Sequence, residues 1–398
     1  MERVDIEQRR RSVAARHHLA PWARSSELLD VVDDLVALHA TDPATVVLSA
    51  WARVDGLAED ALADAQYESR ALIRMMGMRR TVFVFPADLA GVVHQACLPK
   101  IAAANRKRLV ALLEQNGVER AGAWLDAVGA DVLAVLDERG EALAAELSEA
   151  VPALATRITQ HEDKAYGGEG AVNNQVLTLL AMEGKIARGR PRGSSPFANQ
   201  YRWAPVGRWS TSPLDALDPG RAEAELARRW LRTFGPAPAS DLQWWAGWTV
   251  TQTKRALAAT DAVEIEVEVA EGEFEAGHVL PETMAVLDQS SASPWVALLP
   301  ALDPTSMGWK HRDWYLGPHR DHFFDRSGNI GPTIWADGRV VGAWAQRADG
   351  EIVTQLLEDL GADQRSAVAA RAQELRAWLG PLRFKPRFPT PLERTLRS

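Results

Sequence analysis

The apolar positions of the first 90 residues change from helical spacing to strand-like spacing. The segments "IEQRRRSVAARHHL" and "SSELLDVVDDLVALHA" predict two helices, and one face of the second collects Leu28, Val31, Val32, Leu35 and Leu38. A further apolar segment, "TVVLSAWARV", follows Pro43, and "ESRALIRMMGMRRTVFVFP" joins a basic stretch to a β-rich end. Helices followed by a short strand pair predict a winged helix in residues 1–90.

A similar order of elements is predicted twice more. After a helical connector in residues 91–139, "GAVNNQVLTLLAMEG" predicts a helix, and "KIARGRPRGSSPFANQYRWAPV" predicts a hairpin with basic arms. These segments give a second winged helix in residues 140–215. In residues 216–290, three short helical patterns with Gly247 at a sharp turn precede the alternating "AVEIEVEVAEGEFEA", which predicts a third. The alternative is a generic α+β protein with two hairpins.

The pattern beyond residue 290 is turn-punctuated and aromatic. Strand pairs are predicted around Asp337-Gly338 and Asp349-Gly350, and "DQRSAVAARAQELRAWLG" predicts a closing helix. Residues 291–398 therefore form a β-rich C-terminal module. The predicted fold class is α+β, with tandem winged-helix (helix-turn-helix) domains and this mixed module packed on them.

Composition restricts the chemistry that the chain can perform. At 398 residues, with 46% hydrophobic and 25% charged residues, it is expected to be an ordinary globular protein of several packed units, cytoplasmic and not associated with membranes. The single cysteine, Cys97, excludes an internal disulfide and a thiolate metal centre. Glycine-rich phosphate loops and dinucleotide fingerprints are missing from the sequence, so no nucleotide cofactor is expected.

The charge is segregated along the chain. Although the net charge is −8, residues 184–214 contain no Asp or Glu and include Lys185, Arg188, Arg190 and Arg192. A local basic patch of this kind predicts contacts with DNA phosphates, and a solvated loop is the alternative. Arg79 and Arg80 precede a predicted strand, where phosphate contact and a solvated strand start are both open.

A second candidate surface lies in "LDPTSMGWKHRDWYLGPHRDHFFD". An aromatic–basic surface that presses on a sugar–phosphate backbone or an unstacked base is predicted for Trp309, Lys310, Arg312 and Trp314. The alternative is that the tryptophans are core and the turn is solvated. The same stretch is rich in potential ligands, but their spacing matches no strong metal signature, so no metal is expected; they are His311, His319, His322, Asp313, Asp321 and Asp325.

The stretch "LVALHATDP" ends an apolar helical pattern with three polar residues. Because Asp42 precedes a proline, the helix is predicted to end around His39 to Thr41. If extended, residues 39 and 41 face the same way and could hold a water molecule. In the structural alternative His39 terminates the helix favourably and Asp42 makes a local turn bond.

Four stretches together point to a family. They are "LVALHATDPATVVLSAWARV", "LIRMMGMRRTVFVFP", "LLPALDPTSMGWKHRDWYL" and "GNIGPTIWADGRVVGAWAQ". From about residue 5 to residue 385 the chain resembles the bacterial winged-helix DNA-binding proteins that include the AlkZ and YcaQ DNA glycosylases. The resemblance implies tandem winged helices around a channel for double-stranded DNA.

The resemblance also implies a catalytic position. In those glycosylases the catalytic element is Gln-x-Gln or Gln-x-Asp at the end of an early helix, and the matching positions here are His39 and Thr41. His39 could orient water or act as a base, whereas Thr41 cannot replace a carboxylate as a proton acceptor. Asp42 is the nearest carboxylate. The expected catalytic residues are therefore His39, Thr41 and Asp42.

The first functional hypothesis is a monofunctional DNA glycosylase of base excision repair. This hydrolase would remove alkylated, bulky-adducted or crosslinked purines, the N7-alkylguanine type, and the resemblance suggests roles in interstrand-crosslink repair and antibiotic self-resistance. The charged N7-alkylguanine leaves without a general acid, so the enzyme chiefly positions water and stabilises an oxocarbenium ion. The second hypothesis is a non-enzymatic winged-helix regulator or lesion sensor, and the third is a metal-dependent hydrolase. A monomer without cofactors is expected.

Overall fold

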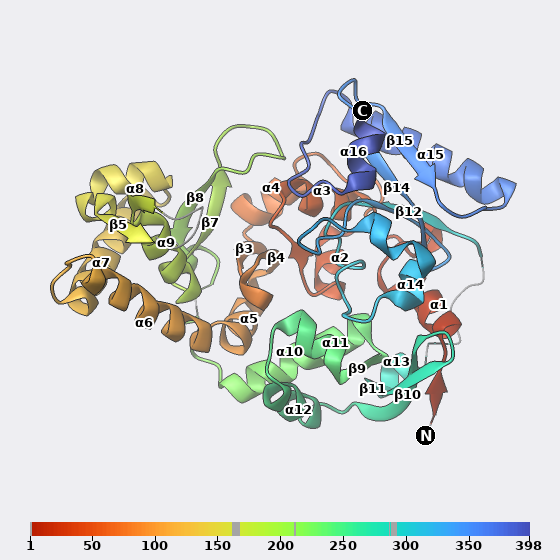
Figure 1. The fold of residues 1–398 in the computed structure, drawn as a ribbon, viewed down its shortest axis with the longest axis horizontal. Helices are drawn as coiled ribbons and strands as arrows, with labels where there is room; N and C mark the ends of the chain where they lie inside the picture. The colour runs from red at the N-terminus through yellow and green to blue at the C-terminus, as the bar shows by residue number, and fades with distance from the viewer. Residues whose placement is uncertain (1, 161–167, 211, 286, 288–292) are drawn as a thin grey trace.

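A central antiparallel sheet joins segments that lie far apart in the sequence. The computed structural model describes residues 2–160, 168–210, 212–285, 287 and 293–398 (Figure 1). The strands of this sheet run in the order β2 (Leu38–His39), β4 (Val82–Pro86), β3 (Leu72–Met76), β7 (Ile186–Pro191) and β8 (Tyr201–Pro205). The basic hairpin β7–β8 meets β3 where Arg74 pairs with Arg188. The hairpin predicted for the second unit therefore shares a sheet with the first unit.

The helix predicted to reach His39 is shorter than expected. The helices and turns of this region are α1 (Ile6–Arg16), η1 (Pro21–Ala23), α2 (Leu28–Asp34), α3 (Pro43–Trp51), α4 (Ala61–Ala63), η2 (Asp64–Glu68), η3 (Met78–Arg80) and η4 (Ala87–Leu89). Helix α2 is capped at Leu35, Val36 has a φ of 64°, and the chain then enters β2. The prediction that Leu35 and Leu38 belong to a helix is therefore wrong. Residues 35–38 are buried, and Leu38 pairs with β4 in place of continuing the helix.

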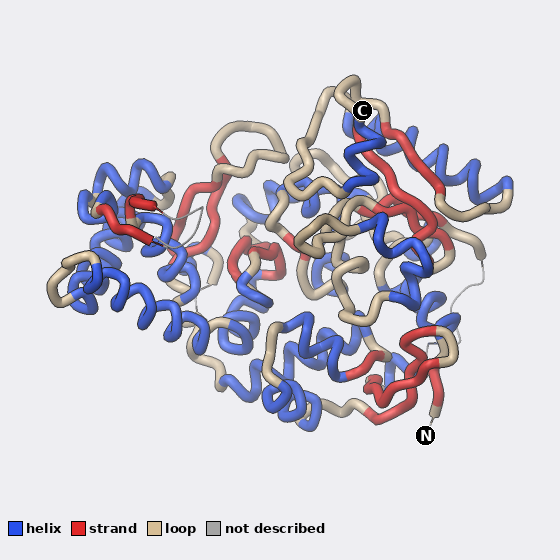
Figure 2. The backbone as a smooth tube through the Cα atoms, viewed as in Figure 1, coloured by secondary structure: helices blue, strands red, loops and turns tan. Residues whose placement is uncertain are grey.

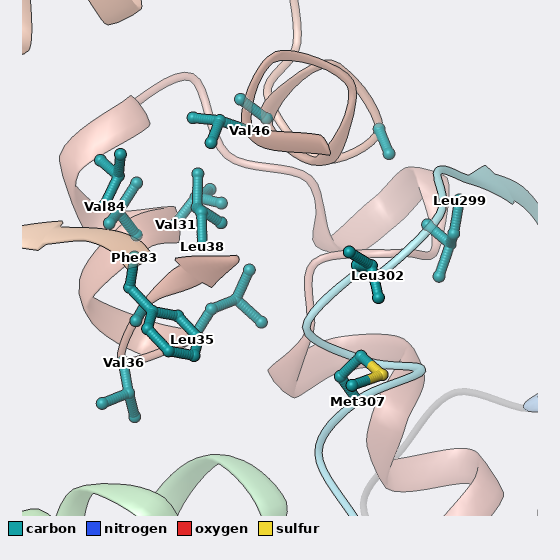
Figure 3. Close-up of a cluster of buried hydrophobic side chains, with 14 of the residues drawn as sticks. Val31, Leu35, Val36, Leu38, Val46, Phe83, Val84, Leu299, Leu302 and Met307 are labelled. Carbon is teal, nitrogen blue, oxygen red and sulfur yellow. The ribbon is translucent and has the colours of Figure 1, made fainter. Parts of the chain in front are cut away.

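The first unit packs against the C-terminal module through a continuous apolar cluster. Figure 3 shows Leu38 and Val84 from neighbouring strands beside Val46 of α3, with Leu302 and Met307 on the adjoining segment. All five side chains are buried. This packing fixes the turn after β2 between a sheet on one side and a helix on the other.

A helical region follows, as predicted for residues 91–139. It consists of α5 (Ala90–Cys97), α6 (Pro99–Gln115) and α7 (Ala121–Arg139), and it continues into α8 (Ala144–Ala150), η5 (Pro152–Ala155), the strands β5 (Arg157–Gln160) and β6 (Gly168–Ala171), α9 (Asn173–Met182) and η6 (Val206–Arg208). Apolar side chains of α6, α7, α8 and α9 form their own buried cluster. In Figure 1 these helices occupy the end of the molecule opposite the C-terminal module.

The segment 219–279 has the predicted order of helices and hairpin. It contains α10 (Pro219–Phe234), β9 (Ala237–Pro238), α11 (Ala239–Ala246), α12 (Val250–Ala258), β10 (Val263–Ala270) and β11 (Glu273–Val279), and α13 (Pro281–Met284) follows. Gly247 lies at the turn between α11 and α12 with a φ of 75°, as predicted. Strand β1 (Arg3–Val4) pairs in parallel with β10, so the start of the chain belongs to this sheet and not to the first unit.

The C-terminal module is an antiparallel sheet with helices against it. Its strands are β12 (Val296–Leu299), β13 (Thr333–Ala336), β14 (Arg339–Gln346) and β15 (Ile352–Leu356). The predicted turn at Asp337-Gly338 joins β13 to β14, and the predicted turn at Asp349-Gly350 joins β14 to β15. The remaining elements are α14 (Asp313–Leu316), η8 (Gly317–Phe323), α15 (Ala362–Leu379) and α16 (Pro391–Arg397). Within the described ranges, no helix combines the length and apolar character needed to cross a bilayer.

Candidate functional site

His39 is a buried residue of the edge strand β2. Its ring is 5% exposed and meets the edge of Phe83, its partner across the strands, at a centroid distance of 5.0 Å. Burial, and secondly the nearby Arg79 cation, lower the pKa of His39 to about 3. His39 is therefore a neutral imidazole at physiological pH, and it projects less openly than expected for a side chain at a helix end.

The neutral state of His39 predicts a pH dependence of stability. An unfolded chain with an ordinary histidine pKa of about 6.5 binds a proton that folded His39 does not bind until about pH 3. Stability is thus highest above pH 6.5 and falls as the pH is lowered. The free energy of unfolding, measured by urea denaturation, should fall between pH 7 and pH 5. In His39→Gln we expect this fall to be smaller by up to about 2 kcal/mol. An unchanged fall would show that folded His39 takes up a proton in this range.

Thr41 and Asp42 form the turn between β2 and α3. The Ala40 N–H donates to the Val82 carbonyl at 2.8 Å, which continues the strand pairing. The Thr41 N–H lies 3.5 Å from Nδ1 of His39, and its side chain is partly exposed. The motif therefore presents Thr41 to solvent and keeps His39 behind it.

Asp42 is the N-cap of α3. Its Oδ1 accepts from the Ala44 N–H at 3.0 Å, and its Oδ2 accepts from the Arg387 N–H at 3.2 Å. Burial raises the pKa of Asp42 against the opposing effect of these two donors. Arg387 also donates to the Thr41 carbonyl at 2.9 Å. Both Asp42 oxygens thus have structural bonds, so the turn bond of the structural alternative is present.

Arg74 lies directly behind the motif, a position that the sequence analysis missed. It is 4% exposed, and its Nη1 donates to the Ala40 carbonyl at 3.1 Å while its Nε donates to Oε1 of Gln66 at 3.3 Å. Its guanidinium stands 4.5 Å from the ring centroid of Tyr201 on β8. An arginine inside the otherwise apolar strand "LIRMM" is the signal that could have identified it.

A pocket opens beside this arginine. Its volume is about 440 Å³. Side chains of α3, of the α4–η2 turn and of the basic hairpin line it, including Val47, Gln66, Tyr67, Arg190 and Tyr201. The hairpin residues of this lining lie more than 100 positions along the sequence from those of α3 and the α4–η2 turn.

The basic hairpin distributes its charges unevenly. Lys185 is exposed and pairs with Glu183 at 2.8 Å, and Arg190 is exposed and pairs with Glu68 at 2.6 Å. Arg188 is only partly exposed and stacks over Trp203 at 3.6 Å. Arg192 is exposed, and in the part of the chain that the structure describes its guanidinium has no ion-pair partner. Arg192 and Arg190 are therefore better placed for phosphate contact than Arg188.

Arg79 and Arg80 occupy the turn between β3 and β4, both with positive φ. Arg80 is exposed, whereas Arg79 packs 4.0 Å above the ring of Trp244, and burial lowers its pKa to about 10. Only Arg80 of the two is free to reach a phosphate without rearrangement.

The predicted aromatic–basic surface is wrong for three of its four residues, because Trp309, Arg312 and Trp314 are buried. Trp309 is 1% exposed and donates from Nε1 to the Phe234 carbonyl at 2.9 Å. Arg312 is buried, with its guanidinium over Trp244 and Phe324. Only Lys310 is exposed. The aromatic run is apolar core, so the stacking role assigned to Trp309 has no accessible ring.

The histidine-rich turn does not assemble a ligand set. In the described ranges no group of three His, Cys, Asp or Glu side chains is placed to hold a metal ion. His311 instead pairs with Asp241, at 3.1 Å, and this partner raises the pKa of His311. The ring centroids of His319 and His322 are 6.4 Å apart.

Comparison with known proteins shows the family of this chain. A family model described as "DNA glycosylase AlkZ-like" matches residues 32–378, which include the motif, Arg74 and the basic hairpin. The chain belongs to the AlkZ-like DNA glycosylase family. The resemblance inferred from the four sequence stretches is thus confirmed.

The structural comparison agrees with this membership. The Streptomyces sahachiroi DNA glycosylase AlkZ matches 95% of this chain and 98% of its own, with a TM-score of 0.71 and 20% sequence identity. At that identity the match shows a shared fold. No curated protein sequence matches the chain. Membership of the AlkZ-like family supports a DNA glycosylase activity.

Proposed function

We propose that this AlkZ-like protein hydrolyses the N-glycosidic bond of N7-alkylated, bulky-adducted or crosslinked purines in double-stranded DNA. One observation supports this most directly: the strand that carries His39 and the basic hairpin that carries Arg190 are parts of one sheet. DNA bound to the hairpin through its phosphates would run past the Thr41 turn. Tandem winged helices would form the surrounding channel.

The turn is suited to position water. Thr41 is the accessible hydroxyl, and neutral His39 behind it holds the turn through Nδ1. A water bound at Thr41 attacks C1′ as the bond from C1′ to N9 breaks, and the electron pair of that bond neutralises the cationic purine. The attacking water then loses a proton to solvent. Asp42 is the nearest carboxylate to the developing oxocarbenium charge.

This chemistry explains how the changed motif can still work. A cationic purine is already a good leaving group, so neither a general acid nor a strong base is required. The pKa of His39, about 3, makes it a weak base but leaves it a stable hydrogen-bonding group at neutral pH. His39 is therefore a positioning residue in this proposal, and Thr41 is the group that touches water.

Base release from damaged DNA tests the proposal. The full chain is incubated with a duplex that contains N7-alkylguanine, and we expect free modified base together with alkali-labile sites. Because no metal takes part, release should persist in EDTA. Salt-sensitive binding without release would favour the regulator or lesion sensor instead, and release abolished by EDTA would favour the metal-dependent hydrolase.

A further inference from the structure

The pocket beside Arg74 has an apolar floor and a polar aromatic wall. Val46, Val47, Leu62, Ala63, Pro196 and Leu382 supply the apolar lining. Gln66, Tyr67, Arg74 and Tyr201 supply the polar and aromatic lining, which forms its wall. A concave site of about 440 Å³ with a few convergent polar groups is typical of small-molecule binding.

Two guanidinium–tyrosine pairs define the chemistry of the wall. The Arg74 guanidinium lies 4.5 Å from the Tyr201 ring centroid, and the Arg190 guanidinium lies 5.0 Å from that of Tyr67. Burial raises the pKa of Tyr67 to about 12 and also raises that of Tyr201, so both rings stay neutral. Flat aromatic faces and cationic donors of this kind accept a planar ring that carries oxygen acceptors.

The charge of the wall selects against cationic ligands. Arg74 is buried and is held by two neutral acceptors, Gln66 and the Ala40 carbonyl, so its positive charge has no carboxylate bonded to it in the described structure. The acidic lining residues, Glu59 and Asp60, are exposed at the rim. Because Arg190 is paired with Glu68, the buried Arg74 supplies the uncompensated charge of the wall, and a cationic purine placed next to it would be repelled, whereas a neutral or anionic ring would not.

The pocket is connected to the motif and partly closed by the C-terminal segment. Arg74 joins the two sites, because the carbonyl that it binds belongs to Ala40, between His39 and Thr41. The loop between β7 and β8 extends toward the C-terminal segment (Figure 2), and Phe197 meets Phe384 there at a centroid distance of 5.6 Å. A group attached to a base at Thr41 thus has a bounded space beside it.

We propose that this pocket binds the planar, neutral or anionic aromatic substituent of a bulky N7-alkylated purine while the cationic purine stays outside at the Thr41–Asp42 turn. The identity of the ring as part of a lesion rests on the proposed function. The ligand class, a planar oxygen-bearing aromatic group, rests on the pocket alone. Binding of such a group would add affinity for bulky lesions over simple methylated ones.

A fluorescent probe tests the pocket without DNA or turnover. The full chain is titrated with 7-hydroxycoumarin-3-carboxylate, and fluorescence anisotropy gives the Kd. Ala63→Trp fills the pocket and Tyr201→Leu removes a stacking ring, and each should weaken binding by about tenfold or more. Ala58→Trp, on the exposed loop before the lining residues, is the matched control and should leave the Kd unchanged. A coumarin with a trimethylammonium group in place of the carboxylate should bind at least about tenfold more weakly than the probe, because the buried Arg74 charge repels it.

The outcomes separate this inference from the proposed function. Failure of the wild-type chain to bind the probe would overturn the pocket assignment, and so would an affinity of Ala63→Trp and Tyr201→Leu equal to that of the wild-type chain.

The same variants are then assayed on N7-methylguanine and on an N7-guanine adduct that bears a coumarin ring. We expect Ala63→Trp to lose release of the ring-bearing adduct and to keep release of N7-methylguanine. Equal loss on both substrates would mean that the pocket takes the base itself. Probe binding without any base release would leave the ligand class intact and overturn its assignment to a lesion.

Discussion

Replacing His39 with alanine should lower kcat for release of an N7-alkylguanine by about 10²-fold, the order found when a group that positions the reactants is lost. The KM for DNA should change little, because His39 is 5% exposed and contributes almost no surface to a DNA contact. Single-turnover release of modified base, with DNA binding measured in parallel, separates the two parameters.

The conservative variant decides whether the role is positioning or folding. His39→Gln places an amide where the resembling glycosylases carry glutamine, and it should restore most of the rate that His39→Ala loses. His18→Ala is a suitable control, since this histidine bonds to Ala23 and Asp34 away from the turn. Equal rates for His39→Ala and the wild-type chain would remove His39 from the mechanism. Loss without rescue by glutamine would reduce it to a structural residue.

The surroundings of His39 show where local pattern stops being informative. Apolar spacing correctly predicts a helix that begins near Leu28, but the same spacing continues through Leu35 and Leu38 after the helix has ended. Those residues are buried on all sides because β4 pairs with one edge and α3 covers them (Figure 3). A fully buried run has no polar face to reveal its period, so helix and strand cannot be distinguished there from the sequence.

The candidate site depends on contacts that no local pattern contains. The turn at Gly247 and the C-terminal hairpins follow from residues adjacent in sequence, and they were predicted. The pairing of Arg74 with Arg188, and the approach of Tyr201 to Arg74, join residues more than 100 positions apart. The pattern of turn-forming residues predicted the hairpin, and its basic residues made it a candidate for phosphate contact. Its union with the first unit required the structure.

One of the four stretches that carry the family resemblance is structural. In "LDPTSMGW", Asp303 and Thr305 bond to Arg53, and Trp309 bonds to Phe234. Gly308 leaves room for the Phe234 ring, since a Cβ there would lie 2.3 Å from it. In the sequence, aromatic and basic residues in one stretch are as consistent with a DNA-binding surface as with a buried structural segment. Burial, which the sequence does not state, is what distinguishes the two interpretations.

The largest stability effect is expected at Asp303. Asp303 and Arg53 are both fully buried, and the guanidinium donates to Oδ1 at 2.6 Å and to Oδ2 at 2.9 Å. The remaining Arg53 donors bond to the His17 and Ser49 carbonyls and to the Thr305 hydroxyl. Asp303→Ala would leave the Arg53 cation buried without a counter-ion, so we expect a loss of about 3–5 kcal/mol in the free energy of unfolding.

Urea denaturation at neutral pH measures this loss against two comparisons. Glu282→Ala removes one partner of the exposed Arg228–Glu282 pair and should cost less than about 1 kcal/mol. The double variant Arg53→Met with Asp303→Leu removes both charges and should recover much of the stability that Asp303→Ala loses, because the main penalty comes from an unpaired buried charge rather than from a missing attraction. A loss at Asp303 no larger than that at Glu282 would show that water or rearrangement satisfies Arg53. In that case the buried pair between Arg53 and Asp303 would not be a main contact that holds the first unit against the C-terminal module.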